Sequence, residues 1–289
     1  MERKKKRMAT LSYEVLVLDG TSRAGDQRLP SGEAIVSSPL SITLISGEHD
    51  AVLVDAPYTF GQIERVRNWI EDSGKTLRHV YITHAHGDHW LGVGELLSSF
   101  PGVTVYATPG TLGRMEREAT VGREKVWDAV FPGLVPPSPL IAEAVPANGF
   151  ELEGNRLVPI ELGHTDTDDT TALWVPSLEL VVAGDSVYSG VHQYVLESSE
   201  EGFASWLAAL DTIEALKPKF VVAGHKAPGA SDDPASIEET RAYLKDAQHL
   251  LATVSSPEEY YDAIMRRYPF RMNPGPVWYG AVGLLSRTH

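Results

Sequence analysis

The chain has 289 residues, of which 43% are hydrophobic, and its formal net charge is −14. This length allows one large core or two small ones, and the acidic balance argues against a nucleic-acid partner, since phosphate contacts supply most of that affinity. The absence of cysteine excludes disulfides and thiolate metal ligands and is compatible with a cytoplasmic location, and no apolar run approaches the roughly 20 residues that span a membrane.

The N-terminal part of the chain predicts a short tail followed by sheet and helix. We interpret the basic residues 1–10 as a disordered tail and residues 11–289 as a single domain, because no apolar run follows that would make a signal peptide. A helix is then predicted after residue 59, where Thr59 and Gln62 have the spacing of a capping box, and Gly74 can end it. Strands are predicted before this helix at residues 15–18, 42–45 and 51–54.

Residues 84–89 read His-Ala-His-Gly-Asp-His, directly after an apolar strand predicted at 79–83. Burying three imidazoles and a carboxylate is costly without compensation, and a metal ion is the usual one. Side chains two positions apart in extended backbone lie on one side, so His84 and His86 can hold one ion together. Asp88 and His89 would then point elsewhere, toward a second ion.

Two segments are predicted to flank a pocket. Residues 108–150 follow a strand at 103–107 and contain a charged helical piece at 114–130 and a proline-dense stretch. Such long ordered segments in compact domains are usually functional. The aromatic, proline-containing residues 270–289 are the second flanking segment.

The second half of the chain repeats one pattern three times: an apolar run ends in glycine, and a residue that can bind metal follows. These residues are His164, Asp185 and His225. Glycine lets the backbone turn and come close to a site. Helices are predicted at residues 201–216, 234–253 and 257–268, and the alternation of strands and helices indicates an α/β layered fold.

The motif at 84–89 and the three later glycine-linked residues together resemble the metallo-β-lactamase superfamily, over about residues 11–226. The resemblance implies an α/β fold of the four-layer αβ/βα sandwich type, with two Zn²⁺ ions in a cleft at one edge. The same residue types also accept Mn²⁺, Fe²⁺ or Co²⁺. The ligands that the resemblance implies are His84, His86 and His164 for one ion, Asp88, His89 and His225 for the other, and Asp185 as the bridge.

This resemblance also implies a reaction. A metal-bridging hydroxide would attack the carbonyl of a small cyclic ester or amide, as in a lactonase, and Asp88 would shuttle a proton. Tyr188 is similar in position to a tyrosine of the acyl-homoserine lactonases, whose hydroxyl faces the substrate carbonyl; a plain packing role is an equal alternative. The expected partner is a small molecule, neither a nucleic acid nor a membrane, and the chain is expected to be a monomer or homodimer.

Two other interpretations stay open. A β-lactamase-like amidase needs a cation for the substrate carboxylate, and Lys226 is the only evident candidate near the site. A metal-binding protein without catalysis would keep the ligands behind a blocked pocket. Three acidic residues after His164 either orient ligand histidines or form a solvated turn, namely Asp166, Asp168 and Asp169. The aromatic candidates for an apolar pocket wall are Tyr58, Trp90, Trp127 and Trp278.

Overall fold

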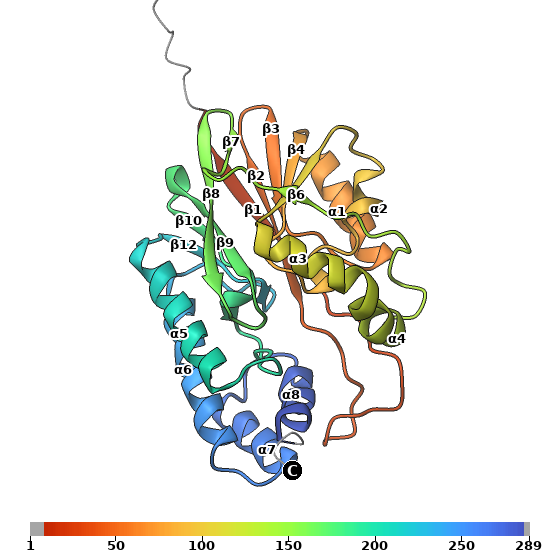
Figure 1. The fold of residues 1–289 in the computed structure, drawn as a ribbon, viewed down its shortest axis with the longest axis vertical. Helices are drawn as coiled ribbons and strands as arrows, with labels where there is room; N and C mark the ends of the chain where they lie inside the picture. Colours follow the sequence, from red (N-terminus) through yellow and green to blue (C-terminus); the bar gives the residue numbers. More distant parts are fainter. Residues whose placement is uncertain (1–8, 286–289) are drawn as a thin grey trace, which may run out of the picture.

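The computed structural model describes residues 9–285, so the predicted basic tail at 1–10 lies almost entirely outside the described residues. Two β-sheets lie face to face, and helices cover their two outer sides (Figure 1). Three separate hydrophobic clusters fill the spaces between these layers. This arrangement confirms the predicted four-layer sandwich.

Two of these helices begin at a side chain that caps them, and the first of the two caps is Thr59, as predicted. The Thr59 side chain accepts a hydrogen bond from the backbone N–H of Gln62, and the Ser256 side chain accepts one from Glu259. No helix among residues 9–285 is long and apolar enough to cross a membrane. The α-helices are α1 Phe60–Asp72, α2 Val93–Leu97, α3 Pro109–Arg117, α4 Asp128–Val130, α5 Glu200–Ala215, α6 Ala235–Leu251, α7 Pro257–Arg267 and α8 Gly275–Leu285.

The first sheet is made by the first half of the chain. Its strands, which pair in chain order, are β1 Ser12–Leu18, β2 Leu40–Ser46, β3 Asp50–Val54, β4 Thr76–Tyr81, β5 Thr104–Ala107 and β6 Glu143–Ala144. Side chains alternate between its two faces. Leu53 packs in the outer cluster with the helices, whereas Val52 and Val54 face the second sheet.

The second sheet pairs in the order β12-β10-β9-β8-β7. Its strands are β7 Phe150–Leu152, β8 Asn155–Gly163, β9 Thr170–Val175, β10 Leu180–Val182 and β12 Phe220–Val222. Val181 packs outward with helices α5 and α6, while Leu180 and Val182 face the first sheet. Two short strands, β11 Tyr188–Ser189 and β13 His225–Lys226, pair in parallel and bring two distant segments together at the sheet edge.

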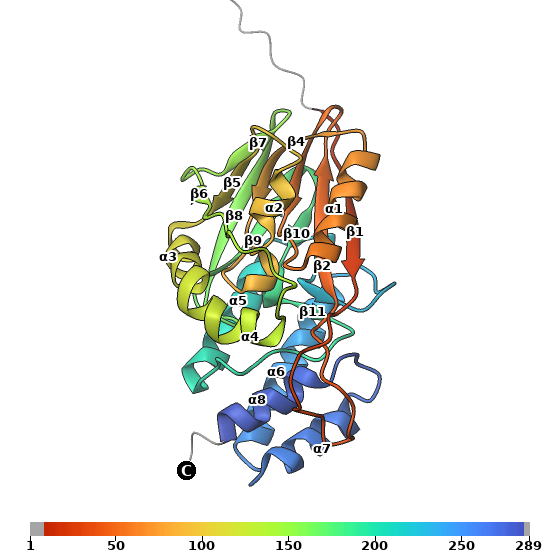
Figure 2. The ribbon, with the colours of Figure 1, turned by 90° about the vertical axis from the view of Figure 1, so that its right-hand side faces the viewer.

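Two irregular segments lie beyond the sheets. Helix α3 continues through a π-helical stretch, Glu118–Trp127, into α4, where the sequence predicts one helical piece. Such stretches are rare and occur frequently at functional sites. The segment between β1 and β2 runs down toward α7 and α8, where Leu29 and Ile35 join the same hydrophobic cluster as Val277 (Figures 1 and 2).

Candidate metal centre

The ends of strands from both sheets meet at one edge of the sandwich, and side chains that can bind metal follow these ends. The glycines there allow close approach. Gly184 has φ +53°, and an added Cβ would lie 2.6 Å from Thr83 Oγ1; one on Gly224 would lie 2.1 Å from Asp185 Oδ1. The strand ends concerned are β3 before Asp55, β4 before residues 84–89, β8 before Asp166, β10 before Asp185 and β12 before His225.

A first group of ligand atoms comes from His84, His86, Asp166 and Asp185, all within 4.8 Å of one another. Asp166 Oδ2 lies 2.8 Å from His86 Nδ1 and 3.7 Å from His84 Nε2. His84, Asp166 and Asp185 are buried, and His86 is partly exposed. Both sheets therefore contribute to this group.

A second group comes from Asp88, His89 and His225, again within 4.8 Å of one another. Asp185 lies beside this group too: its Oδ1 is 3.3 Å from His89 Nε2 and its Oδ2 is 3.0 Å from His225 Nε2. Asp185 therefore contacts both groups, and it is the residue to which the resemblance assigns a bridging role.

The buried polar atoms of these groups fit a bound cation. Four of them make no well-directed hydrogen bond among the described residues, although Asp166 Oδ2 and Asp185 Oδ1 each lie close to an imidazole nitrogen, at 2.8 and 3.3 Å. A buried polar group without a partner costs free energy, and a metal ion placed among these atoms would remove that cost. Imidazole and carboxylate ligands suit Zn²⁺ and other divalent ions. The four atoms are His84 Nε2, His89 Nε2, Asp166 Oδ2 and Asp185 Oδ1.

His164, which the sequence assigns to the first ion, is in neither group. Its Nδ1 is 2.6 Å from Asp168 Oδ1, and Asp168 also pairs with Arg114. Its Nε2 faces the first turn of α5, where a Cβ added to Gly202 would lie 2.8 Å away. Asp166, two residues later on the same turn, is in the first group, and its Oδ1 accepts a hydrogen bond from Thr165.

Asp55, which was not predicted from the sequence, orients two histidines of these groups. Its Oδ2 accepts hydrogen bonds of 2.9 Å from His89 Nδ1 and from Thr83 Oγ1. Because the Thr83 hydroxyl donates to Asp55, it accepts from His84 Nδ1, also at 2.9 Å. Both imidazoles therefore turn Nε2 toward the centre. The sequence does contain a signal for Asp55. This residue follows the apolar run 51–54, just as Asp185 follows an apolar run of its own.

Two further contacts fix the remaining histidines. His225 Nδ1 donates to the carbonyl of Pro39 at 2.7 Å, so its Nε2 faces Asp185. His86 Nε2 lies 2.9 Å from Glu197 Oε1, and the other oxygen of Glu197 accepts a 2.7 Å hydrogen bond from Thr167. No motif in the sequence points to Glu197, because it lies in a loop far from its partner.

The charges of the centre are strongly coupled. Burial alone would raise the pKa of the Asp185 carboxyl, but His225 and His89 beside it hold that pKa well below its usual range. Burial works against a proton on His86 as well, yet Asp166 and Glu197 raise the pKa of this imidazole well above its ordinary value. The centre therefore favours negative carboxylates that face positive charge, either protons or metal ions.

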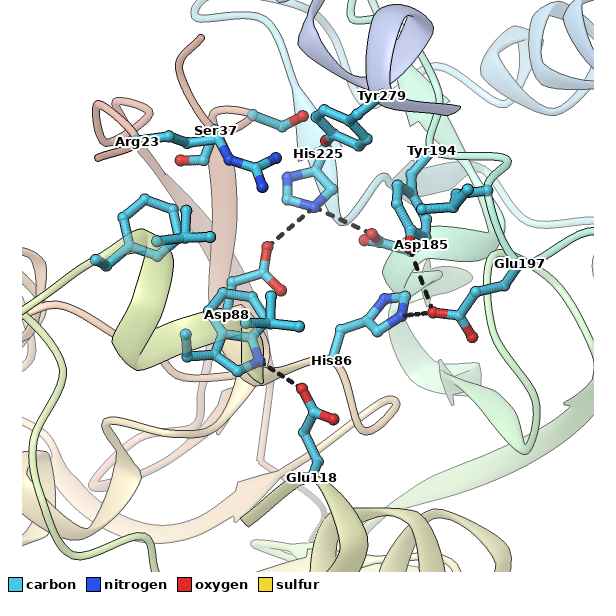
Figure 3. Close-up of a pocket in the computed structure, with 16 residues that line it drawn as sticks. Arg23, Ser37, His86, Asp88, Glu118, Asp185, Tyr194, Glu197, His225 and Tyr279 are labelled. Atoms are coloured by element: carbon cyan, nitrogen blue, oxygen red, sulfur yellow. Dashed lines mark hydrogen bonds and ion pairs between the residues drawn. The ribbon is translucent and has the colours of Figure 1, made fainter. Parts of the chain in front are cut away.

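A pocket of about 340 Å³ opens over both groups, with Asp185, His86, Asp88 and His225 among its lining (Figure 3). Both segments predicted to flank a pocket contribute to it. Residues 108–150 supply Glu118, Val126, Trp127, Val130 and Phe131, and residues 270–289 supply Tyr279. Of the four aromatic residues proposed from the sequence, Trp127 alone is in the lining, whereas Trp90 is fully buried in the core.

Tyr188 and Lys226 are not among the residues that line this pocket. The Tyr188 side chain is fully buried, and its hydroxyl donates a 2.9 Å hydrogen bond to Asp185 Oδ2. Tyr188 thus contacts Asp185, whereas the resemblance to lactonases implies a hydroxyl that faces the substrate. Lys226 is also buried, and its Nζ lies 2.5 Å from Asp232 Oδ1, so its charge is already paired.

Comparisons with known proteins agree with this architecture. Residues 38–225 match the sequence profile of the metallo-beta-lactamase superfamily. A metallo-beta-lactamase type 2 from Bacteroides fragilis is 26% identical over 203 residues, which cover 67% of this chain and 72% of that protein.

Solved structures with the same fold include a metallo-beta-lactamase family protein from Thermus thermophilus, with a TM-score of 0.62, 19% identity and 92% of each chain covered. Another is a metallo-beta-lactamase from Pseudomonas aeruginosa in a mono-zinc form, with a TM-score of 0.54, 17% identity, and 82% of this chain and 92% of that chain covered. Identities this low establish the fold and not the substrate.

Proposed function

The chain belongs to the metallo-β-lactamase superfamily, whose members are mostly metal-dependent hydrolases, and on this premise we propose that it is a dinuclear metal-dependent hydrolase. Its substrate in this proposal is a small cyclic ester, so that the enzyme is lactonase-like. Zn²⁺ is the proposed ion, with Mn²⁺, Fe²⁺ or Co²⁺ as alternatives for the same residue types.

One observation carries the proposal: buried imidazole and carboxylate atoms that make no well-directed hydrogen bond belong to two adjacent groups, and Asp185 contacts both. We assign Asp166 to the first ion in place of His164. The proposed ligands are His84, His86 and Asp166 for one ion, Asp88, His89 and His225 for the other, and Asp185 for both.

Divalent ions bound there supply Lewis acidity and a hydroxide nucleophile at neutral pH. Residues of the chain itself supply the substrate binding and the proton transfer. Trp127 and Phe131 form an apolar wall that holds the body of the substrate and excludes water. Asp88 lies between the centre and the pocket, with Oδ2 3.5 Å from His225 Nε2. In this proposal the Asp88 carboxylate takes a proton from the attacking water as the new C–O bond forms, and it passes this proton to the leaving oxygen as the ring C–O bond breaks.

A cyclic amide is the second candidate substrate, because the relative from Bacteroides fragilis is a metallo-beta-lactamase. An amide nitrogen must be protonated before it leaves, so this reaction depends more strongly on Asp88 than ring opening of an ester does. The chromogenic β-lactam nitrocefin separates the two candidates directly.

The test is a hydrolysis screen with zinc-loaded protein against lactones, β-lactams, thioesters and phosphodiesters. We expect ring opening of lactones that a chelator abolishes and added zinc restores. The matched variants are His86→Ala, which should be inactive, and His249→Ala on the exposed face of α6, which should behave like the wild type. A zinc-loaded chain that hydrolyses none of these compounds would instead be a non-catalytic metal-binding relative.

A further inference from the structure

Arg23 is the one arginine or lysine among residues 9–285 that lines the pocket. Its guanidinium points into the pocket from the same side as His225 and Asp88, while Glu197 lies on the opposite side (Figure 3). It rests on the Tyr279 ring, 4.7 Å from the ring centroid, and forms no ion pair with a carboxylate in the described part of the chain. Its charge is therefore available to a ligand.

The backbone holds this arginine in place. Arg23 N donates a 3.0 Å hydrogen bond to the carbonyl of Ile35, and the next residue, Ala24, donates a 2.8 Å bond to the carbonyl of Val130 at the end of α4. Ser22 pairs with Val36 across the same loop. Anchoring on both sides reduces the entropy lost when a ligand binds, which distinguishes Arg23 from a mobile surface arginine.

The segments that carry Arg23 and Tyr279 lie outside residues 38–225, the part that matches the superfamily profile. All the proposed metal ligands lie inside it. The shared part of the chain thus supplies the reaction centre, and the parts before and after it supply this cation and its aromatic support. Such a feature is suited to select a substrate and not to perform the chemistry.

The pocket itself indicates which anion fits. A guanidinium binds a carboxylate or phosphate through two parallel hydrogen bonds. Four carboxylates also line the pocket, namely Asp88, Glu118, Asp185 and Glu197. Two of these, Glu118 and Glu197, are not proposed metal ligands, and they repel a doubly charged phosphate more strongly than a singly charged carboxylate, so the carboxylate is favoured. Lys226 cannot take this role, because it is buried and paired with Asp232.

We propose that Arg23, supported by Tyr279, binds a carboxylate of the substrate, so that the enzyme prefers cyclic acyl substrates that carry a carboxylate next to the scissile bond. This inference rests on the proposed hydrolase function for its substrate. The carboxylate-binding site itself can be tested without turnover.

The kinetic test uses two substrates that share a lactone ring and differ only in a ring carboxylate or its methyl ester. Loss of a charge-assisted hydrogen-bond pair in Arg23→Gln should raise KM for the carboxylate substrate about 10- to 100-fold. The methyl ester should be hydrolysed as before, with zinc content unchanged. Arg23→Lys should restore part of the preference, and Arg28→Gln, on the exposed tip of the same loop, is the matched control. An equal effect on both substrates, or none on either, would overturn the proposal.

A binding experiment separates failure of this inference from failure of the proposed function. Phenylacetate and neutral phenylacetamide are titrated calorimetrically into zinc-loaded wild type and Arg23→Gln. We expect phenylacetate to bind the wild type at least about 10-fold more tightly than the variant, with no such difference for the amide. If this holds while no lactone is hydrolysed, the hydrolase proposal fails and the carboxylate site stands. Equal phenylacetate affinity for both proteins refutes the site.

Discussion

The floor and the outer wall of the pocket are built differently. The floor consists of buried side chains at the ends of strands from both sheets, and the hydrogen bonds that its histidines donate to Asp55, Thr83 and Pro39 fix their orientation. The outer wall consists of loop and helix residues such as Arg23, Val126 and Tyr279, which are partly or fully exposed. Changes in the floor should therefore affect metal binding and catalysis together, whereas changes in the wall should affect the choice of substrate alone.

The largest difference in zinc affinity is expected between substitutions of two neighbouring residues near the floor, Asp166 and His164. Asp166→Ala removes a proposed ligand, so zinc should bind the first group more than about 100-fold more weakly, a greater loss than an orienting residue causes. His164→Ala removes the contacts with Asp168 and with the first turn of α5, but no proposed ligand, and should retain both ions. Competition with a chromophoric chelator measures both affinities. Loss of zinc from His164→Ala and not from Asp166→Ala would reverse the assignment.

Asp55→Asn should have the next largest effect on zinc affinity. The amide keeps the size of the side chain but loses the negative charge of the carboxylate, whose Oδ2 accepts hydrogen bonds from His89 Nδ1 and Thr83 Oγ1. Loss of such an orienting partner should weaken zinc binding about 10- to 100-fold. The same chelator competition measures it, with Asp211→Asn on the surface of α5 as the control. Unchanged zinc affinity would mean that Asp55 does not orient the ligands.

Tyr188→Phe distinguishes a positioning role from a catalytic one. Removing the hydrogen bond to Asp185 should weaken zinc binding about 10-fold, and kcat at saturating zinc should change little. A hydroxyl that faced the substrate carbonyl would instead lower kcat at least about 100-fold under the same conditions. Steady-state kinetics across a zinc titration separate the two.

The smallest effect on substrate hydrolysis is expected from a substitution in the outer wall of the pocket. Val126 lines the pocket and is 44% exposed, so Val126→Ser should be well tolerated by the fold. Removing its apolar contact should raise KM for a lactone with an apolar side chain about 3-fold, with zinc content unchanged. A loss of zinc in this variant would break the distinction between floor and wall.

The sequence predicts which strand ends meet at the floor, because the signals for them are local. The motif at 84–89 and the glycines before Asp185 and His225 each follow a buried strand, and strands of such sandwiches end at a common edge. The fold class follows from the same alternation of strands and helices. Physical chemistry of single residues also explains the capping of α1 at Thr59.

The remaining features depend on tertiary structure. His164 and Asp166 lie two residues apart on one turn, and the pairing of His164 with Asp168 beside α5 decides which side chain reaches the centre. Arg23 and Glu197 reach the pocket from loops without regular structure, so no periodicity marks them. Lys226 is adjacent to His225 in sequence but turns to Asp232.

The number of zinc ions per chain tests the central claim most directly. Protein saturated with zinc is freed of excess metal by gel filtration and analysed by inductively coupled plasma mass spectrometry. We predict two ions per chain in the wild type and in His249→Ala, and fewer than two in His86→Ala. Zinc at 100 times its dissociation constant should also raise the free energy of unfolding by about 2.7 kcal/mol for each independent site. A wild-type chain that retains no zinc, or a His86→Ala variant that retains both ions, would contradict the account.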